Sequence, residues 1–209
     1  MLNTIKNLVV FQNIAQDNLI KECLSCLHTP LASAKAPLIN KFIIVAEKLS
    51  LKDNLLRSYL IYLLSQKHNI IAELVMQDYV IGTSLKQALL SDMVILTQLL
   101  TMLPSSFLDS VILDDYTPSV NNHNQAFNSL YHNIKNSLST ITPESLSQIL
   151  IEHYQTYGIG DLSNYKAFRW DKEKTLLGIK NFDKITFNDF VGYERQKNIV
   201  LANTLAFVN

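Results

Sequence analysis

The segment Leu51-Lys52-Asp53-Asn54-Leu55-Leu56-Arg57-Ser58-Tyr59-Leu60-Ile61-Tyr62-Leu63 decides the fold class of this chain. Its apolar residues recur at intervals of three and four, which is the spacing of one face of a helix. The stripe consists of Leu51, Leu55, Leu56, Tyr59, Leu60 and Leu63. We therefore expect a helix here, at the centre of the core.

The same spacing extends in both directions from this segment. Further apolar stripes run through residues 19–27, 85–103, 127–138 and 146–154, and another helix is expected from about Pro37. Breaks separate them at Thr29-Pro30, Gly82-Thr83-Ser84, Pro104 and Tyr157-Gly158. After Gly82 a hydroxyl side chain is expected to cap the next helix, and Thr142-Pro143-Glu144 has the order of a helix start.

The residue composition and pattern of the sequence change after Gly158. Glycines, aromatic residues and mixed charges replace the leucine stripes, and helical spacing returns only from about Glu194 to Phe207. We predict a mainly α protein in three parts: a helical, bundle-like N-terminal domain over residues 1–157, an aromatic linker over 158–184, and a short mixed extension over 185–209.

Composition limits the classes of partner. Hydrophobic residues make up 48% of the 209 residues, enough for a packed core. Lys plus Arg and Asp plus Glu both number 18, so no field of one sign draws the chain to nucleic acid or to an anionic membrane. The most apolar run, Met93 to Leu103, is about half the length of a membrane span. With two cysteines and no recognisable export signal, we expect a cytoplasmic location.

Cys23, Cys26 and His28 are the residues that most resemble a metal site. Two thiolates and an imidazole are ordinary zinc ligands at short spacing, but a closed site needs a fourth ligand and no other cysteine exists. Both thiols also fall on the apolar face of the expected helix. We therefore predict structural cysteines and no metal.

The other polar residues that could carry chemistry are scattered. Asp109, Asp114 and Asp115 could hold a cation or lie solvated beside a turn, and the second interpretation is favoured. The sequence contains no GxSxG, HExxH or GxxxxGK[ST], and the histidines at 123, 132 and 153 have no partner at catalytic spacing. We expect no catalytic residue in this chain and no enzymatic activity of its own.

The C-terminal part carries a more specific pattern. It runs through Tyr165-Lys166-Ala167-Phe168-Arg169-Trp170, Leu177-Gly178-Ile179, Ile185 to Lys197, and Asn203-Thr204. In order and spacing these segments resemble a bacterial family of AAA+ ATPases catalogued as a domain of unknown function. The likeness is specific over about the last fifth of the chain and only general over the helical part.

The resemblance implies that Phe190 to Lys197 enters the ATPase module, with the Walker A loop further on. We expect the printed chain to stop ahead of that loop, so that ATP and Mg²⁺ are cofactors of the parent protein and not of this chain. By resemblance Val191 and Gly192 contribute to the adenine pocket, since glycine lets the backbone approach a flat base. The alternative is an ordinary strand-to-helix turn with Gly192 as its hinge.

Three hypotheses of function follow. The first is a non-catalytic accessory region of an AAA+ ATPase that docks a protein partner or substrate or regulates the motor, and the resemblance favours it. The second is a free-standing helical interaction module, and the third an enzyme in its own right.

The C-terminal helix has an apolar face that consists of Ile199, Ala202, Ala206 and Phe207. This face is expected to pack on the aromatic linker or, as we slightly favour, on a second copy in a homodimer.

Overall fold

The computed structural model describes residues 2–28, 32–120, 124–160, 165, 167–172, 176–179 and 185–208. It divides into two compact units, Met1–Tyr165 (unit 1) and Lys166–Asn209 (unit 2). The mainly α fold predicted from the sequence is confirmed. Each unit is described by itself.

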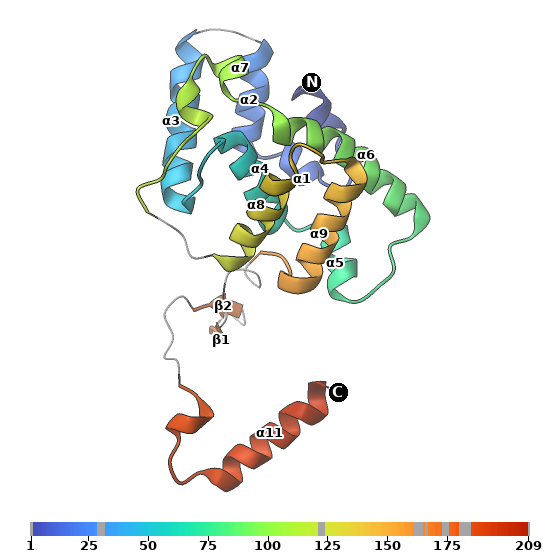
Figure 1. Cartoon of the computed structure of the whole chain (residues 1–209), viewed down its shortest axis with the longest axis vertical. Coiled ribbons are helices and arrows are strands. Elements are labelled where there is room, and N and C mark those ends of the chain that lie inside the picture. The colour runs from blue at the N-terminus through green and yellow to red at the C-terminus, as the bar shows by residue number, and fades with distance from the viewer. Residues whose placement is uncertain are drawn as a thin grey trace. The chain divides into compact units, whose positions relative to one another are not determined.

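Unit 1 consists of helices joined by short turns (Figure 1). Its described elements are η1 (Leu2–Asn7), α1 (Gln12–Ala15), α2 (Asn18–His28), α3 (Ala32–Leu49), α4 (Leu55–Gln66), α5 (Ile70–Met76), α6 (Thr83–Thr101), α7 (Ser105–Leu108), η2 (Val111–Leu113), α8 (Gln125–Ser137) and α9 (Pro143–Tyr157).

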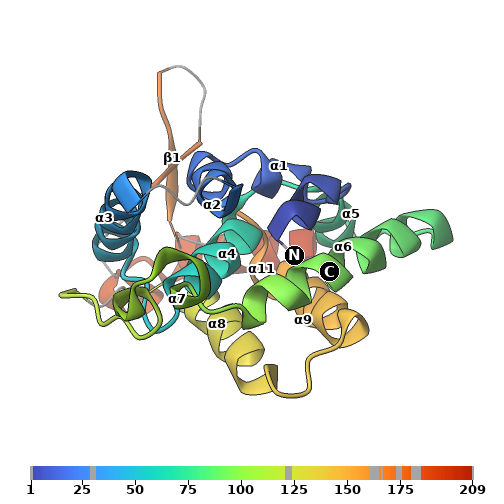
Figure 2. The same ribbon diagram turned by 90° about the horizontal axis from the view of Figure 1, so that it is seen from above.

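Helix α4 lies in the middle of unit 1, as Figures 1 and 2 both show. It contacts α1, α3, α6 and α8, while α9 closes the other side against α5, α6 and α8. Nine of its twelve residues are buried, among them Leu55, Leu60 and Leu64. The prediction of a central helix is therefore confirmed, although Leu51 lies in the turn before α4 and not within it.

The N-terminal segment is tied to α6 by one buried carboxylate. Asp92 is fully buried, and its Oδ2 accepts hydrogen bonds from the backbone N–H groups of Val10 at 2.8 Å and Phe11 at 2.9 Å. The N–H of Val9 donates to Oδ1 at 2.9 Å. A carboxylate out of water needs such donors, so Asp92 stabilises the turn that joins η1 to α1.

Side-chain caps define several helix starts. Asn54, Asn69 and Asn124 each accept a hydrogen bond from the N–H three residues on, and Thr142 forms a capping box with Ser145 ahead of Pro143. The helix start expected at Thr142-Pro143 is confirmed. The hydroxyl cap expected after Gly82 is wrong: Gly82 itself is the N-cap of α6 and no side chain caps that end.

Helix α3 also differs from the prediction. It begins at Ala32, before the expected start at about Pro37, and Pro37 lies within it. Alanine has the highest helix propensity, and alanines at 32, 34 and 36 extend the helix ahead of the proline. Proline is tolerated best in the first turn of a helix, whereas Pro37 is the sixth residue of α3 and lacks the N–H that would bond within the helix.

Unit 2 contains a hairpin of β1 (Phe168–Trp170) and β2 (Leu176–Gly178), then η3 (Phe187–Asp189) and α11 (Glu194–Val208). The strands are antiparallel, with Arg169 opposite Leu177. No residue of unit 2 whose burial is described is buried, and Trp170 is 71% exposed. Unit 2 thus has no core of its own among its described residues.

None of the helices in the described part of the chain is long and apolar enough to cross a membrane.

Candidate functional site

The segment around Val191 and Gly192 connects two well-defined local structures. Thr186 opens η3 with a capping box: its N–H and its Oγ1 donate to Oδ2 of Asp189 at 2.6 and 2.8 Å. These hydrogen bonds lower the pKa of Asp189, because they favour the charged carboxylate. Phe190 and Val191 then lead to Gly192 and into α11.

Gly192 makes the turn into α11. Its φ is +82°, in the left-handed region that side-chain-bearing residues rarely adopt, and a Cβ placed there would meet nothing within 4 Å. Val191 beside it is 87% exposed. The backbone here is open on the side where a flat ligand could approach, but the described residues of unit 2 do not enclose one.

Helix α11 follows with an unusual distribution of side chains. Lys197 pairs with Glu194 at 2.8 Å in its first turn. From Ile199 onward apolar residues occur on every side: Ile199, Val200, Leu201 and Leu205 are all substantially exposed. The sequence predicted one apolar face, whereas a helix apolar all round is typical of one that is enclosed by other elements.

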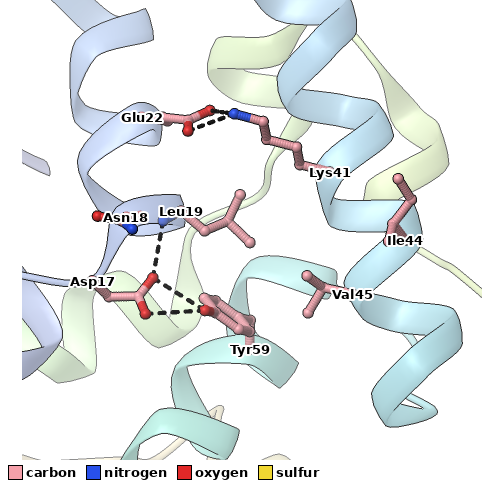
Figure 3. Close-up of a pocket in the computed structure, with 8 residues that line it drawn as sticks. All are labelled: Asp17, Asn18, Leu19, Glu22, Lys41, Ile44, Val45 and Tyr59. Carbon is pink, nitrogen blue, oxygen red and sulfur yellow. Dashed lines mark hydrogen bonds and ion pairs between the residues drawn. The ribbon is translucent and has the colours of Figure 1, made fainter.

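A hollow of unit 1 lies between the start of α2, α3 and α4 (Figure 3). It is a pocket of about 480 Å³ with Leu19 and Val45 among its apolar walls. Tyr59 donates its hydroxyl to both carboxylate oxygens of Asp17 at 3.1 Å, and Asp17 accepts the N–H of Leu19 at 3.0 Å. Burial and Asp17 together raise the pKa of Tyr59.

This hollow contains no pair of groups ready for proton transfer or nucleophilic attack. The Asp17 carboxylate is occupied by Tyr59 and by the N–H groups at the start of α2, and at the rim Lys41 pairs with Glu22 at 2.6 Å. Sequence patterns do not indicate this pocket, since Asp17 and Tyr59 are 42 residues apart and no local pattern connects them.

The two cysteines lie on α2, and both side chains are buried. Burial is the main cause that raises the pKa of Cys23, followed by the nearby Cys26 and Glu22. A thiol held in its neutral form is a poor metal ligand and a poor nucleophile. The side chain of His28 lies outside the described residues, and those residues contain no group of three His, Cys, Asp or Glu arranged for a metal ion.

The acidic residues near α7 have structural partners. Asp109, in a left-handed conformation at the end of α7, pairs with Lys35, and Oδ1 of Asp114 accepts the N–H of Ser105 at 2.9 Å. Asp115 is exposed. Two of the three carboxylates thus hold the chain around α7.

Of the three histidines named above, His132 lies on α8 and His153 on α9. His123 lies outside the described residues, and His132 is exposed with its ring edge-on to Tyr131. His153 is buried, 5.4 Å from the ring of Tyr157, and burial lowers its pKa to about 4. Its Nε2 has no hydrogen-bond partner among the described residues, so His153 is a neutral core residue.

The comparison with family models concerns the C-terminal part. Residues 163–209 match a family described as Protein of unknown function (DUF815). The DUF815 match begins three residues before unit 2 and includes the hairpin, Val191, Gly192 and α11. No curated protein and no solved structure matches the chain.

Proposed function

We propose that this chain consists of a non-catalytic accessory region, residues 1–157, an aromatic linker, residues 158–184, and the first part of an AAA+ ATPase module, residues 185–209. In this proposal ATP and Mg²⁺ bind to the parent protein, and unit 1 docks a protein partner or substrate or regulates the motor. The observation that carries the proposal is the DUF815 match to a unit whose described residues form no core of their own.

The exposure of unit 2 supports an incomplete module. A segment of this size needs a hydrophobic core, a metal or cross-links to be stable alone, and its described residues have none of these. An isolated two-stranded hairpin is marginal in water as well. Helix α11, apolar on all sides, fits a position inside a larger fold, as the ATPase module offers.

The geometry at Val191 and Gly192 agrees with a contribution to an adenine pocket. The missing Cβ of Gly192 leaves the backbone free to approach a flat base, and the exposed Val191 supplies an apolar contact. The printed sequence contains no phosphate-binding loop, so we expect residues 1–209 neither to hydrolyse ATP nor to bind it tightly.

Unit 1 supports the accessory role because it has a continuous core and, among its described residues, no evident catalytic group. The same features suit a free-standing interaction module, which is the alternative. The two differ in one respect: only the first requires that residues 185–209 act together with a nucleotide site.

The proposal can be tested in the intact gene product that contains this chain. The test compares substitutions of two exposed valines, Val191 in unit 2 and Val80 in unit 1. Val191→Asp should raise the KM for ATP about tenfold, because it places a carboxylate against the adenine. Val80→Asp, at a residue 94% exposed in unit 1, should leave it unchanged. An intact gene product without ATPase activity, or equal KM values for the two variants, would contradict the proposal.

We also propose that α11 pairs with a second copy when residues 1–209 are studied alone at high concentration. Burying Ile199 stabilises by about 1.5 to 3 kcal/mol per side chain relative to exposure. Light scattering should show a dimer that Ile199→Asp disrupts. A chain that is monomeric at all concentrations, or a dimer that survives Ile199→Asp, would exclude this pairing.

A further inference from the structure

A cluster of charged side chains lies where the turn before α4 meets the end of α8. Asp53 occupies a left-handed position in this turn, with φ +57°, and its backbone pairs with that of Tyr116. Its Oδ2 accepts hydrogen bonds from the hydroxyl of the buried Tyr131 and from Nζ of Lys135. The one carboxylate of the cluster is thus already engaged.

Two further cations, Lys52 and Arg57, lie near the same place. Nζ of Lys52 lies 5.5 Å from the centre of the Tyr131 ring, and Nζ of Lys135 lies 5.8 Å from it. The guanidinium of Arg57 is fixed by a 2.6 Å hydrogen bond from Nε to the carbonyl of Leu100.

Among the described residues, Arg57 has no direct counterion. Partial burial lowers its pKa, and Tyr131 and Asp53 act only through space to raise it. In the described part of the chain no carboxylate forms an ion pair or hydrogen bond with Arg57 or Lys52. A half-buried cation without a paired anion is unfavourable in free energy. The cluster can therefore accept one more negatively charged group.

The net charge of this cluster is opposite in sign to that of unit 1 as a whole. Acidic residues outnumber basic ones in Met1–Tyr165, yet here Lys52 and Lys135 lie near the carboxylate of Asp53, and Arg57 interacts with it through space. Between Lys86 and Lys166, Lys135 is the one lysine or arginine of the sequence, and it lies in this cluster. The cluster therefore carries two positive charges in excess.

We propose that Lys52, Arg57 and Lys135 form a binding site for a phosphate group. An excess of two charges matches a phosphate, which carries about −1.5 to −2 at neutral pH, better than a carboxylate with −1. The guanidinium adds a planar fork of donors suited to phosphate oxygens, and Asp53 with Tyr131 holds Lys135 in place. This site belongs to unit 1 and does not depend on the proposed ATPase relationship.

The test is an NMR titration of residues 1–209 with inorganic phosphate, and in parallel with AMP, against sodium chloride of equal ionic strength. We expect saturable shifts at the amides of residues 52, 53 and 135. Lys52→Met should weaken phosphate binding about tenfold or more, since it removes a charged contact without breaking a hydrogen bond of the fold. Lys67→Met, at the exposed far end of α4, should have no effect.

Arg57→Lys keeps the charge but removes the fork, so it should weaken binding less than Lys52→Met combined with Lys135→Met. Tighter binding of AMP than of phosphate would identify a nucleotide as the source of the group, and equal binding would identify phosphate itself. Shifts that do not saturate, or binding that is equal in Lys52→Met and Lys67→Met, would overturn the proposal.

Discussion

Units 1 and 2 are both mainly helical, yet different forces hold them. In unit 1 the helices bury one another, and even polar groups such as Asp92 and Asn69 lie inside with hydrogen-bond partners. In unit 2 the helix α11 is formed by its own backbone hydrogen bonds while its leucines stay exposed. The difference teaches that a helical pattern specifies local structure, whereas stability depends on what the apolar side chains contact.

A leucine-to-alanine substitution should lower the free energy of unfolding far more in unit 1 than in unit 2. This is the largest difference that we expect. Leu60→Ala removes a fully buried side chain from α4, and we expect a loss of about 3 to 5 kcal/mol in the free energy of unfolding. Leu205→Ala in α11, at a residue 60% exposed, should change it by less than about 0.5 kcal/mol. Urea denaturation followed by circular dichroism measures both. Similar losses would show that α11 belongs to the cooperative core.

Asp92→Asn tests whether the buried carboxylate of α6 anchors the N-terminal turn of unit 1. The amide group replaces one oxygen and faces backbone N–H donors, so that hydrogen bonds to Val10 and Phe11 or to Val9 are lost. We expect a loss of about 3 kcal/mol, since hydrogen bonds to a charged group are worth about 1.5 to 3 kcal/mol each. Asp115→Asn, at an exposed position, is the control. A loss below about 1 kcal/mol for Asp92→Asn would mean that the N-terminal turn is not anchored there.

His153 should make unit 1 sensitive to acid. Its pKa is about 4 when folded and about 6.5 when unfolded, so the unfolded chain binds the proton first as the pH falls. Stability is therefore complete above about pH 6.5 and decreases toward pH 4, by about 2 kcal/mol between pH 7.5 and 5. In His153→Phe this decrease should be smaller by that amount, whereas His132→Gln, an exposed control, should retain it. Equal pH profiles for the wild type and His153→Phe would contradict this assignment.

The two capped segments offer the smallest contrast. Asn124→Ala removes the cap of α8 and should cost about 1 kcal/mol of unfolding free energy. Thr186→Ala removes the capping box of η3 in unit 2 and should leave the main unfolding transition unchanged. Thermal denaturation distinguishes them, and a Tm lowered equally by both variants would argue against two independent units.

The sequence predicts the elements of this fold better than its interactions. The periodicity of Leu55 to Leu63 locates the central helix, and Thr142-Pro143 locates the start of α9, because both signals are local. The start of α3 was misplaced because a run of alanines outweighs the proline. Short elements such as α5 and α7 have too few residues for a periodic signal.

The candidate sites show the same limit. The motif around Gly192 could be found because its residues are adjacent in the sequence. The Asp17 and Tyr59 pocket, the buried Asp92 and the cations around Asp53 depend on contacts between residues more than 40 positions apart. No spacing rule connects such residues, so only the packed helices reveal them.

Amide hydrogen exchange tests the central claim most directly, namely that unit 1 has its own core and unit 2 requires a larger module. It should be followed in residues 1–209 at concentrations where the chain is monomeric, and again in the intact gene product. We predict that α4 and α9 exchange only through global unfolding in both samples, and that α11 exchanges rapidly in residues 1–209 but is protected in the intact gene product. Protection of α11 equal to that of α4 in the monomeric chain, or rapid exchange of α11 in both samples, would contradict the account.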